Sequence, residues 1–177
     1  MRNSLYIIIS LFGIGTLING CNFLNVDSDH APEIQPSYFY VNPIFNGDTL
    51  VSAEDTLQLI NTDAEGYDHL DSITLGDTVV FAAAYYSHEK DLVSVTVEWD
   101  STRMDLKLDI NEEISQQLCN PSNIEAGKLY FNPGFHLVSF PCKFTAKKEG
   151  ILPIKLTIAS TSEYSPVSIG FKIPAKK

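Results

Sequence analysis

Alternation of apolar and polar residues in short stretches is the feature that most constrains the fold of this 177-residue chain. The stretch LVSVTVEW at 92–99 places three valines and Trp99 on one face and Ser, Thr and Glu on the other. Residues 138–144 and 151–159 alternate in the same way. A period of two with β-branched residues is typical of half-buried strands. Residues 78–86 are apolar on both faces, which predicts a central strand.

Further short strands are predicted along the chain, at 38–41, 56–61, 72–75, 104–110, 128–132 and 166–174. The sequence HEKD at 88–91 predicts a hairpin loop, and Pro141 predicts an edge position or a bulge. One short helical excursion is expected near 111–119, with Asn111 as its N-cap. Eight or nine strands with turns between them predict an all-β fold, a two-sheet antiparallel sandwich.

The stretch FTAKKEGILPIKLTIAS at 144–160 resembles the hairpin before the penultimate strand of immunoglobulin-like and fibronectin-like sandwiches. There too a strand ending in Phe, a charged turn with Gly and an alternating strand follow one another. The resemblance implies an immunoglobulin-like sandwich. It covers about the last hundred residues, and the strand at 78–86 lacks the cysteine that antibody domains carry.

The N-terminus predicts export. Residues 5–18 are almost wholly apolar, but fourteen residues make only about 21 Å of helix, too short for a bilayer core of about 30 Å. With Arg2 before it, the stretch is typical of a secretory signal. The sequence Ile18-Asn19-Gly20-Cys21 then resembles the lipobox of bacterial lipoproteins. An ordinary signal peptide cut elsewhere is the alternative.

The lipobox resemblance implies that residues 1–20 are removed and that the Cys21 thiol carries lipid. Residues 21–36 are polar and acidic with two prolines, which predicts a tether, and the folded domain is then expected at 37–177. In an oxidising compartment the remaining pair, Cys119 and Cys142, is expected to form a disulfide. Such a bridge would stabilise the fold by about 3 kcal/mol. The alternative is two unpaired buried thiols.

Charge is distributed unevenly along the chain. The net charge is −10, and residues 21–78 carry eleven carboxylates and no Lys or Arg. Residues 101–177 carry ten basic and seven acidic side chains. Because proteins that bind nucleic acid present basic stripes, this composition excludes that class of partner.

The segment NTDAEGYDHLDS at 61–72 is a candidate calcium loop. Asn61, Asp63, Glu65 and Gly66 occupy the first, third, fifth and sixth places, and Asp68 and Asp71 offer further oxygen ligands. The twelfth place holds Ser72 instead of Glu. The alternative is an acidic connection made of good turn formers, and no other cofactor is expected.

No catalytic motif is present. The four histidines, His30, His69, His88 and His136, have no zinc-site spacing, and the chain lacks GxSxG, HExxH and a glycine-rich phosphate loop. A non-enzymatic chain is therefore expected. Two of the many carboxylates acting as a glycosidase pair is the alternative.

Five sites read Asp, then a hydroxyl residue, then an apolar residue or Thr. They resemble the O-glycosylation motif of Bacteroides-type bacteria, and the hydroxyl residues are Thr49, Thr56, Ser72, Thr78 and Ser101. The alternative is that Asp-Thr forms a favourable junction between a turn and a strand.

Together, the lipobox, the acidic tether and the sandwich resemble small envelope lipoproteins of the Bacteroides group. This resemblance implies a lipid-anchored binding or scaffolding module at the outer membrane, with a protein or glycan ligand. A hydrolase accessory and a calcium-dependent adhesion module are the alternatives. Acid follows the cysteine only at Asp27 and Asp29, so the periplasmic and surface faces both stay open. The aromatic residues considered for ligand contact are Tyr38, Phe39, Tyr40, Tyr67, Tyr130 and Phe135.

Overall fold

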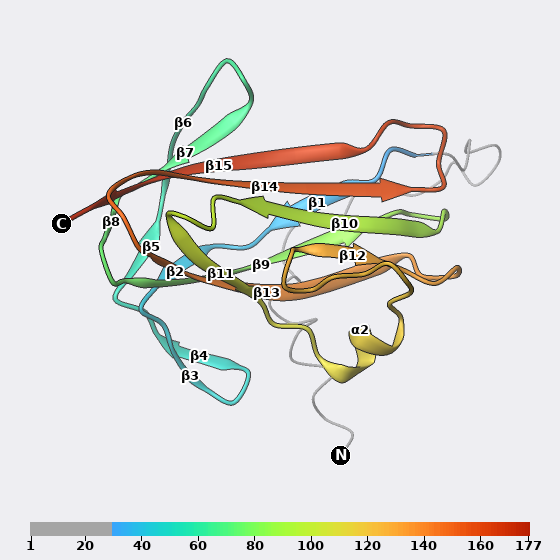
Figure 1. Cartoon of the computed structure of the whole chain (residues 1–177), viewed down its shortest axis with the longest axis horizontal. Coiled ribbons are helices and arrows are strands. Elements are labelled where there is room, and N and C mark those ends of the chain that lie inside the picture. The colour runs from blue at the N-terminus through green and yellow to red at the C-terminus, as the bar shows by residue number, and fades with distance from the viewer. Residues whose placement is uncertain (1–29) are drawn as a thin grey trace, which may run out of the picture.

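The structure, a computed structural model, describes residues 30–177 and consists of two facing β-sheets. Figure 1 shows the two layers, with β10, β14 and β15 above β9, β11 and β13. The first sheet has the order β11-β13-β9-β2-β5, with β1 also on β9. Its strands are β1 (Glu33–Pro36), β2 (Phe39–Val41), β5 (Asp55–Leu57), β9 (Thr78–Tyr86), β11 (Met104–Leu108) and β13 (Leu137–Ala146).

The second sheet has the order β12-β10-β14-β15-β7-β6, with β8 also on β15. Its strands are β6 (Leu59–Thr62), β7 (Tyr67–Leu70), β8 (Ile73–Thr74), β10 (Leu92–Trp99), β12 (Lys128–Tyr130), β14 (Gly150–Ser160) and β15 (Val167–Lys176). A separate two-stranded hairpin contains β3 (Ile44–Asn46) and β4 (Thr49–Ser52). The helix α2 (Glu112–Gln116) lies in the predicted excursion and is capped by the Asn111 side chain, which accepts from Ile114 N at 2.8 Å.

The strand order is immunoglobulin-like. The run β1-β9-β13-β11 in one sheet and β10-β14-β15 in the other correspond to the ABED and CFG sheets of that fold. The all-β, immunoglobulin-like sandwich is therefore confirmed. It departs from a purely antiparallel arrangement, because β7 and β8 both pair in parallel with β15.

Alternation on the inner strands builds the core between the sheets. Strand β13 buries every second residue from Val138 to Ala146, and β14 does the same from Leu152 to Ile158. Aromatic rings join the layers: the ring centroid of Phe39 in β2 lies 4.3 Å from that of Phe81 and 4.9 Å from that of Phe171 across the sandwich. These inner faces are what holds the two sheets together.

Two details of the strand predictions were wrong. Val93 is 40% exposed and Leu92 is 1% exposed, because a register shift between residues 92 and 94 turns the start of β10 over. Pro141 lies in β13, between β11 and β9, and not at an edge. There the Pro141 carbonyl still accepts from Asp109 N at 2.9 Å, directly after the end of β11 at Leu108, so only the N–H that proline lacks is missing from the pairing.

The connections at 88–91 and 147–150 also differ from the predicted hairpins. Strand β9 is in the first sheet and β10 in the second, and the same holds for β13 and β14. Both turns therefore carry the chain from one layer to the other. The first pairing of the sandwich, Glu33 with Tyr86, lies within residues 21–36, so the sheet begins four residues before the predicted domain start at 37.

Candidate functional site

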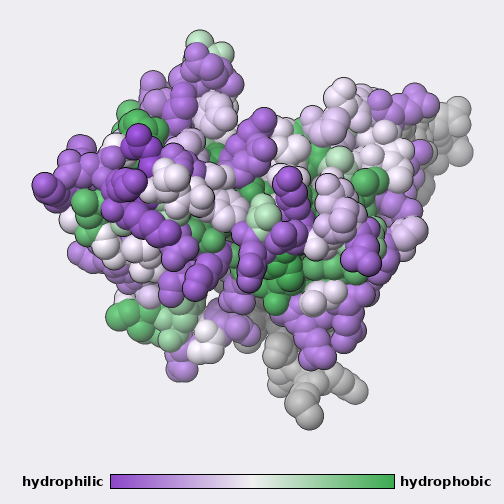
Figure 2. Space-filling view, in the orientation of Figure 1, coloured by the Kyte–Doolittle hydropathy of each residue, from purple (hydrophilic) through white to green (hydrophobic). Residues whose placement is uncertain are grey.

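The β3–β4 hairpin, which we call the arm (residues 44–52), is the most unusual part of the surface. In Figure 1 it projects away from both sheets, and it pairs with neither of them. Ile44 is 61% exposed, Phe45 45% and Val51 64%. Figure 2 shows a hydrophobic surface at this place. Ile44 and Phe45 are consecutive and point to opposite faces, so the arm exposes apolar side chains on both sides.

Local sequence explains why the arm forms. Asn46 pairs with Thr49, which leaves Gly47 and Asp48 as a two-residue loop. Gly47 has a φ of 61°, as the first central position of a type II′ turn requires. An isolated two-stranded hairpin is marginally stable in water, and here neither face is covered by the sandwich.

The root of the arm is fixed to the first sheet by Asn42. Its amide donates to Glu54 Oε2 at 2.7 Å and to Asp77 Oδ1 at 3.0 Å, and its carbonyl accepts from Thr78 N at 2.9 Å. These contacts hold residue 42 at a φ of 46°. Three exposed acids, Asp48 in the loop of the arm and Glu54 and Asp55 directly after it, accompany the apolar side chains in a region without Lys or Arg.

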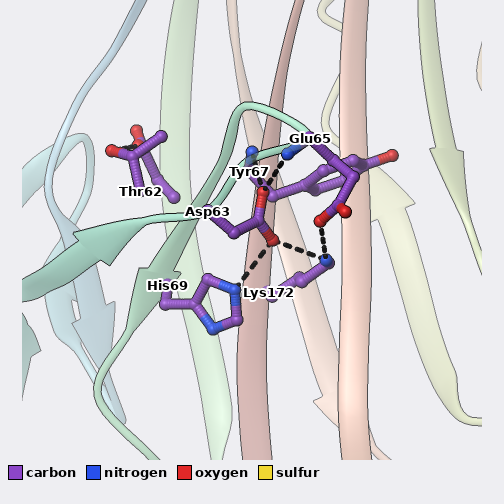
Figure 3. A network of polar contacts seen from close by, with 7 residues as sticks. Thr62, Asp63, Glu65, Tyr67, His69 and Lys172 are labelled. Atoms are coloured by element: carbon purple, nitrogen blue, oxygen red, sulfur yellow. Dashed lines mark hydrogen bonds and ion pairs between the residues drawn. The ribbon is translucent and has the colours of Figure 1, made fainter.

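A second prominent feature is a polar network at the β6–β7 hairpin, shown in Figure 3. Asp63 accepts from Lys172 Nζ at 2.6 Å, lies 2.9 Å from His69 Nε2, and accepts from the backbone N–H groups of Tyr67 and Glu65. The Lys172 Nζ also lies 4.8 Å from the centroid of the Tyr67 ring. This network fastens the β6–β7 hairpin to β15.

The network shifts the pKa values of both Asp63 and Lys172. The hydrogen bond from Lys172, with the backbone donors behind it, holds the pKa of the Asp63 carboxyl well below its usual value. The hydrogen bond to Asp63 raises the pKa of Lys172 above its ordinary value. Both groups therefore stay charged across the physiological range.

The network also occupies the calcium-loop candidate. Residues 61–72 form the β6–β7 hairpin and its end instead of a single cation loop. The ligands proposed for calcium have other partners: Asp63 binds Lys172, Asp68 accepts from Thr62 Oγ1 at 2.7 Å, and Asp71 accepts from Gln58 N at 3.0 Å. Asn61 is exposed and Glu65 faces Lys172 at 3.6 Å. Within residues 30–177 no group of three or more His, Cys, Asp or Glu side chains is placed to hold a metal ion.

The predicted disulfide is not formed: Cys119 and Cys142 are both free. Cys142 points into the core from β13, whereas Cys119 follows α2 and donates to Phe131 O at 3.6 Å beside β12. The two thiols thus belong to different layers. Burial raises the pKa of Cys142 to about 12.

The aromatic candidates separate by burial. Phe39 is part of the core at 4% exposure, and Tyr38 is 67% exposed. The others are half-buried: Tyr40, Tyr67, Tyr130 and Phe135. Because Tyr38 and Tyr40 share a parity opposite to that of Phe39, they lie on the outer face of the first sheet, with ring centroids 6.3 Å apart.

The hydroxyl residues of the glycosylation motif also differ in exposure. Thr49, Ser72 and Ser101 are exposed, whereas Thr56 and Thr78 are half-buried. The Thr78 hydroxyl lies 3.4 Å from that of Thr145. Glycosylation stays a prediction, with the three exposed residues as its better candidates.

No described constellation suits catalysis. A depression of about 380 Å³ lies beside Trp99, and its carboxylates Glu98 and Glu125 are both exposed. A glycosidase acid is usually desolvated so that it keeps its proton, and this arrangement does not provide that. His88 Nε2 lies 3.3 Å from Glu33 Oε1, and the ring centroids of His88 and His30 lie 5.3 Å apart. Among residues 30–177 these three side chains, like all others, are not placed to hold a metal ion together.

The lipidation residue Cys21 and the signal at 1–20 lie outside the described residues, and both stay predictions. Within 30–177, no helix has the length and apolar character needed to cross a bilayer.

Comparison with known proteins gives no family. No family model matches the chain, and no curated protein matches it. Solved structures give distant matches: the secreted serine protease VesC from Vibrio cholerae, at 11% identity and a TM-score of 0.38, matches over 60% of this chain and 21% of its own. A PapD-like domain of human CEP192 matches at 6% identity over 92% and 97%, with a TM-score of 0.37.

A third match is BslA, a bacterial hydrophobin, at 14% identity over 84% of this chain and 98% of that one, with a TM-score of 0.32. The chain spans between a fifth and just over half of the first three solved chains that it matches. Because all these TM-scores lie below 0.5, the fold assignment rests on strand order and packing.

The Asp63 network predicts a defined response to acid. A carboxyl whose pKa is lowered in the folded state contributes stability above its unfolded pKa of about 3.9, and this contribution is lost as the pH falls below that value. We therefore expect urea midpoints of the Asp63→Asn variant to change less between pH 5 and pH 2 than those of the wild type. The Asp48→Asn variant, which alters an exposed acid in the arm, should keep the wild-type dependence.

The free cysteines predict unequal labelling. In the native protein at pH 8, iodoacetamide should modify half-buried Cys119 faster than Cys142, whose burial and raised pKa keep it as a thiol. Mass spectrometry after unfolding without reductant should then find Cys142 modified. A pair that resists the reagent until dithiothreitol is added would contradict the structure.

Proposed function

We propose that the chain is a lipid-anchored, non-enzymatic binding module of the bacterial outer membrane, of the Bacteroides type, and that it holds a protein partner through the arm. The observation that supports this proposal is the arm itself, a hairpin with apolar side chains exposed on both faces. An uncovered hairpin is marginally stable. A partner that covers the arm therefore buries its apolar side chains and also stabilises the hairpin.

The free energies of side-chain burial and of association favour a protein as the ligand. Full burial of a side chain such as Ile44, Phe45 or Val51 contributes about 1.5–3 kcal/mol each. Association itself costs on the order of 4–15 kcal/mol. The three side chains are therefore able to form the centre of an interface only if a partner encloses them on both faces. A protein groove supplies such an enclosure.

Charge defines the partner further. Asp48 lies in the loop of the arm and Glu54 and Asp55 directly after it, and residues 21–78 contain no Lys or Arg. A partner groove with an apolar floor and basic edges complements this surface, and the charges chiefly raise the association rate. Such an interface has the apolar centre and polar rim of ordinary protein–protein contacts.

The anchoring part of the proposal rests on the sequence before Glu33. If Cys21 is lipidated, eleven residues separate it from the first strand, a reach of at most about 40 Å. That distance places the domain within contact of other envelope proteins. The exposed positions Thr49, Ser72 and Ser101 would carry any glycans.

The anchor predicts a change of location for the Cys21→Ser variant. The wild-type chain should sediment with membranes and show a mass increase at Cys21, whereas the variant should stay soluble or keep its leader. Cys119→Ser is the matched control and should remain with the membranes. A wild-type chain that carries no added acyl mass at Cys21 would contradict lipidation.

The arm predicts loss of partner contact in the Phe45→Asp and Val51→Asp variants. Chemical cross-linking in intact cells should give a discrete adduct with the wild type, and each arm variant should reduce its yield at least tenfold. Val93→Asp, at an exposed apolar position outside the arm, is the matched control.

All three positions are exposed, so urea midpoints of the variants should correspond to changes within about 0.5 kcal/mol. An adduct that forms equally with both arm variants would exclude the arm as the binding element. Failure of Cys21→Ser to change location would leave this test unaffected.

A further inference from the structure

The outer face of the first sheet carries a row of side chains in register. Lys107 pairs with Lys143, Lys143 with Val80, and Val80 with Tyr40. All four lie on the outer face, because their neighbours along each strand, among them Leu106, Phe144, Phe81 and Phe39, are buried in the core. We call this row, together with Tyr38, the outer strip.

One end of the outer strip is cationic. Lys107 and Lys143 are exposed and stand directly opposite each other on antiparallel strands, an arrangement of like charges that destabilises a sheet. No carboxylate within residues 30–177 forms an ion pair with either lysine. A depression of about 170 Å³ lies beside them and is also lined by Asp105, Phe144 and Thr145. The Asp105 carboxylate forms an ion pair with Lys147, whose Nζ lies 3.7 Å from Asp105 Oδ1.

The other end of the outer strip is aromatic. Tyr38 is 67% exposed and Tyr40 is half-buried, and their ring centroids lie 6.3 Å apart. Between the two ends, the outward residues of β9 are Val80 and Ala82, whose side chains are smaller than those of lysine and tyrosine. Neighbouring strands are about 4.8 Å apart, so about 14 Å of backbone separates Lys107 from Tyr40.

From this arrangement we propose that the outer strip binds an acidic oligosaccharide, with a sugar ring against Tyr38 and Tyr40 and a carboxylate or sulfate at Lys107 and Lys143. Tyrosine rings offer an apolar face to the C–H groups of a sugar and a hydroxyl to its oxygens. The anion removes the repulsion between the two ammonium groups. Repulsion from the acidic residues elsewhere is screened over about 8–10 Å at ordinary ionic strength.

Alternative occupants use only part of the strip. A free phosphate would engage the lysines and leave the tyrosines unused. A peptide added as a strand requires an open sheet edge with free backbone groups, and the strip lies on a sheet face. The proposal uses none of the residues of the arm, whose strands pair with neither sheet.

The test measures binding of the full chain by calorimetry to three acidic hexasaccharides: galacturonate, mannuronate and a heparin-derived sulfated fragment. A neutral dextran hexasaccharide and inorganic phosphate are the reference ligands. We expect at least one acidic hexasaccharide to bind, with an affinity that falls as salt is raised, and the dextran to bind at least tenfold more weakly.

Variants at both ends then locate the site. Lys143→Gln should weaken binding about tenfold, as the loss of a charged contact does, and Tyr38→Ala about fivefold, as the loss of one aromatic contact of about 1 kcal/mol does. The matched controls Lys128→Gln and Tyr164→Ala alter an exposed lysine and an exposed tyrosine outside the strip and should stay within twofold.

Four results would overturn the proposal: no binding of any acidic hexasaccharide, equal binding of dextran, full competition by phosphate with no effect of Tyr38→Ala, or equal losses in Lys128→Gln. The variants change exposed side chains, so unaltered urea midpoints separate lost binding from lost folding.

Discussion

The packing of Phe39, Phe81 and Phe171 between the sheets is the interaction on which the rest of the structure depends. These rings come from β2, β9 and β15, so they join the first strands of the domain to its last one. Around them, β13 and β14 each contribute an unbroken series of inward side chains. Because the inner faces carry the stability, the outer faces and the connections are free to differ in charge and shape. The arm and the outer strip both occupy that free surface.

The sequence predicts the inner faces well and the connections poorly, for a physical reason. Alternation is a property of a single strand, and it correctly places residues 138–144 and 151–159 in half-buried strands. Whether two successive strands share a sheet depends on contacts far along the chain. The turn at 147–150 therefore looks like a hairpin in the sequence, although β13 and β14 lie in different layers. Likewise, a register shift reverses the inward and outward alternation at Val93, and no residue near Val93 predicts this shift.

The site residues show the same dependence on contacts far along the chain. The spacing of oxygen ligands at 61–72 matches a calcium loop, but Lys172, more than a hundred residues away, neutralises Asp63 at 2.6 Å. Cys119 and Cys142 form an even pair, yet one faces the core and the other follows α2. Tyr38 was among the aromatic candidates, and alternation with Phe39 could have separated its outward position from the core. The row from Lys107 to Tyr40 could not have been found, because register across four strands is invisible in the sequence.

The position of the arm follows from the connection between β2 and β5, which are neighbouring strands of the first sheet. Strand β2 pairs with β9 in one sheet, and β7 and β8 pair with β15 in the other. Because β2 and β5 pair with each other, residues 42–54 leave the first sheet and return to it, and the chain crosses to the second sheet only between β5 and β6. A connection that leaves and rejoins the same sheet can lengthen at small entropic cost, because the cost of closing a loop grows only slowly with its length. Asn42, at one end of this connection, donates to Glu54 at the other end and is bound to the first sheet through Thr78. The sandwich thus presents an apolar, acid-rimmed hairpin from a fixed base without weakening its own core.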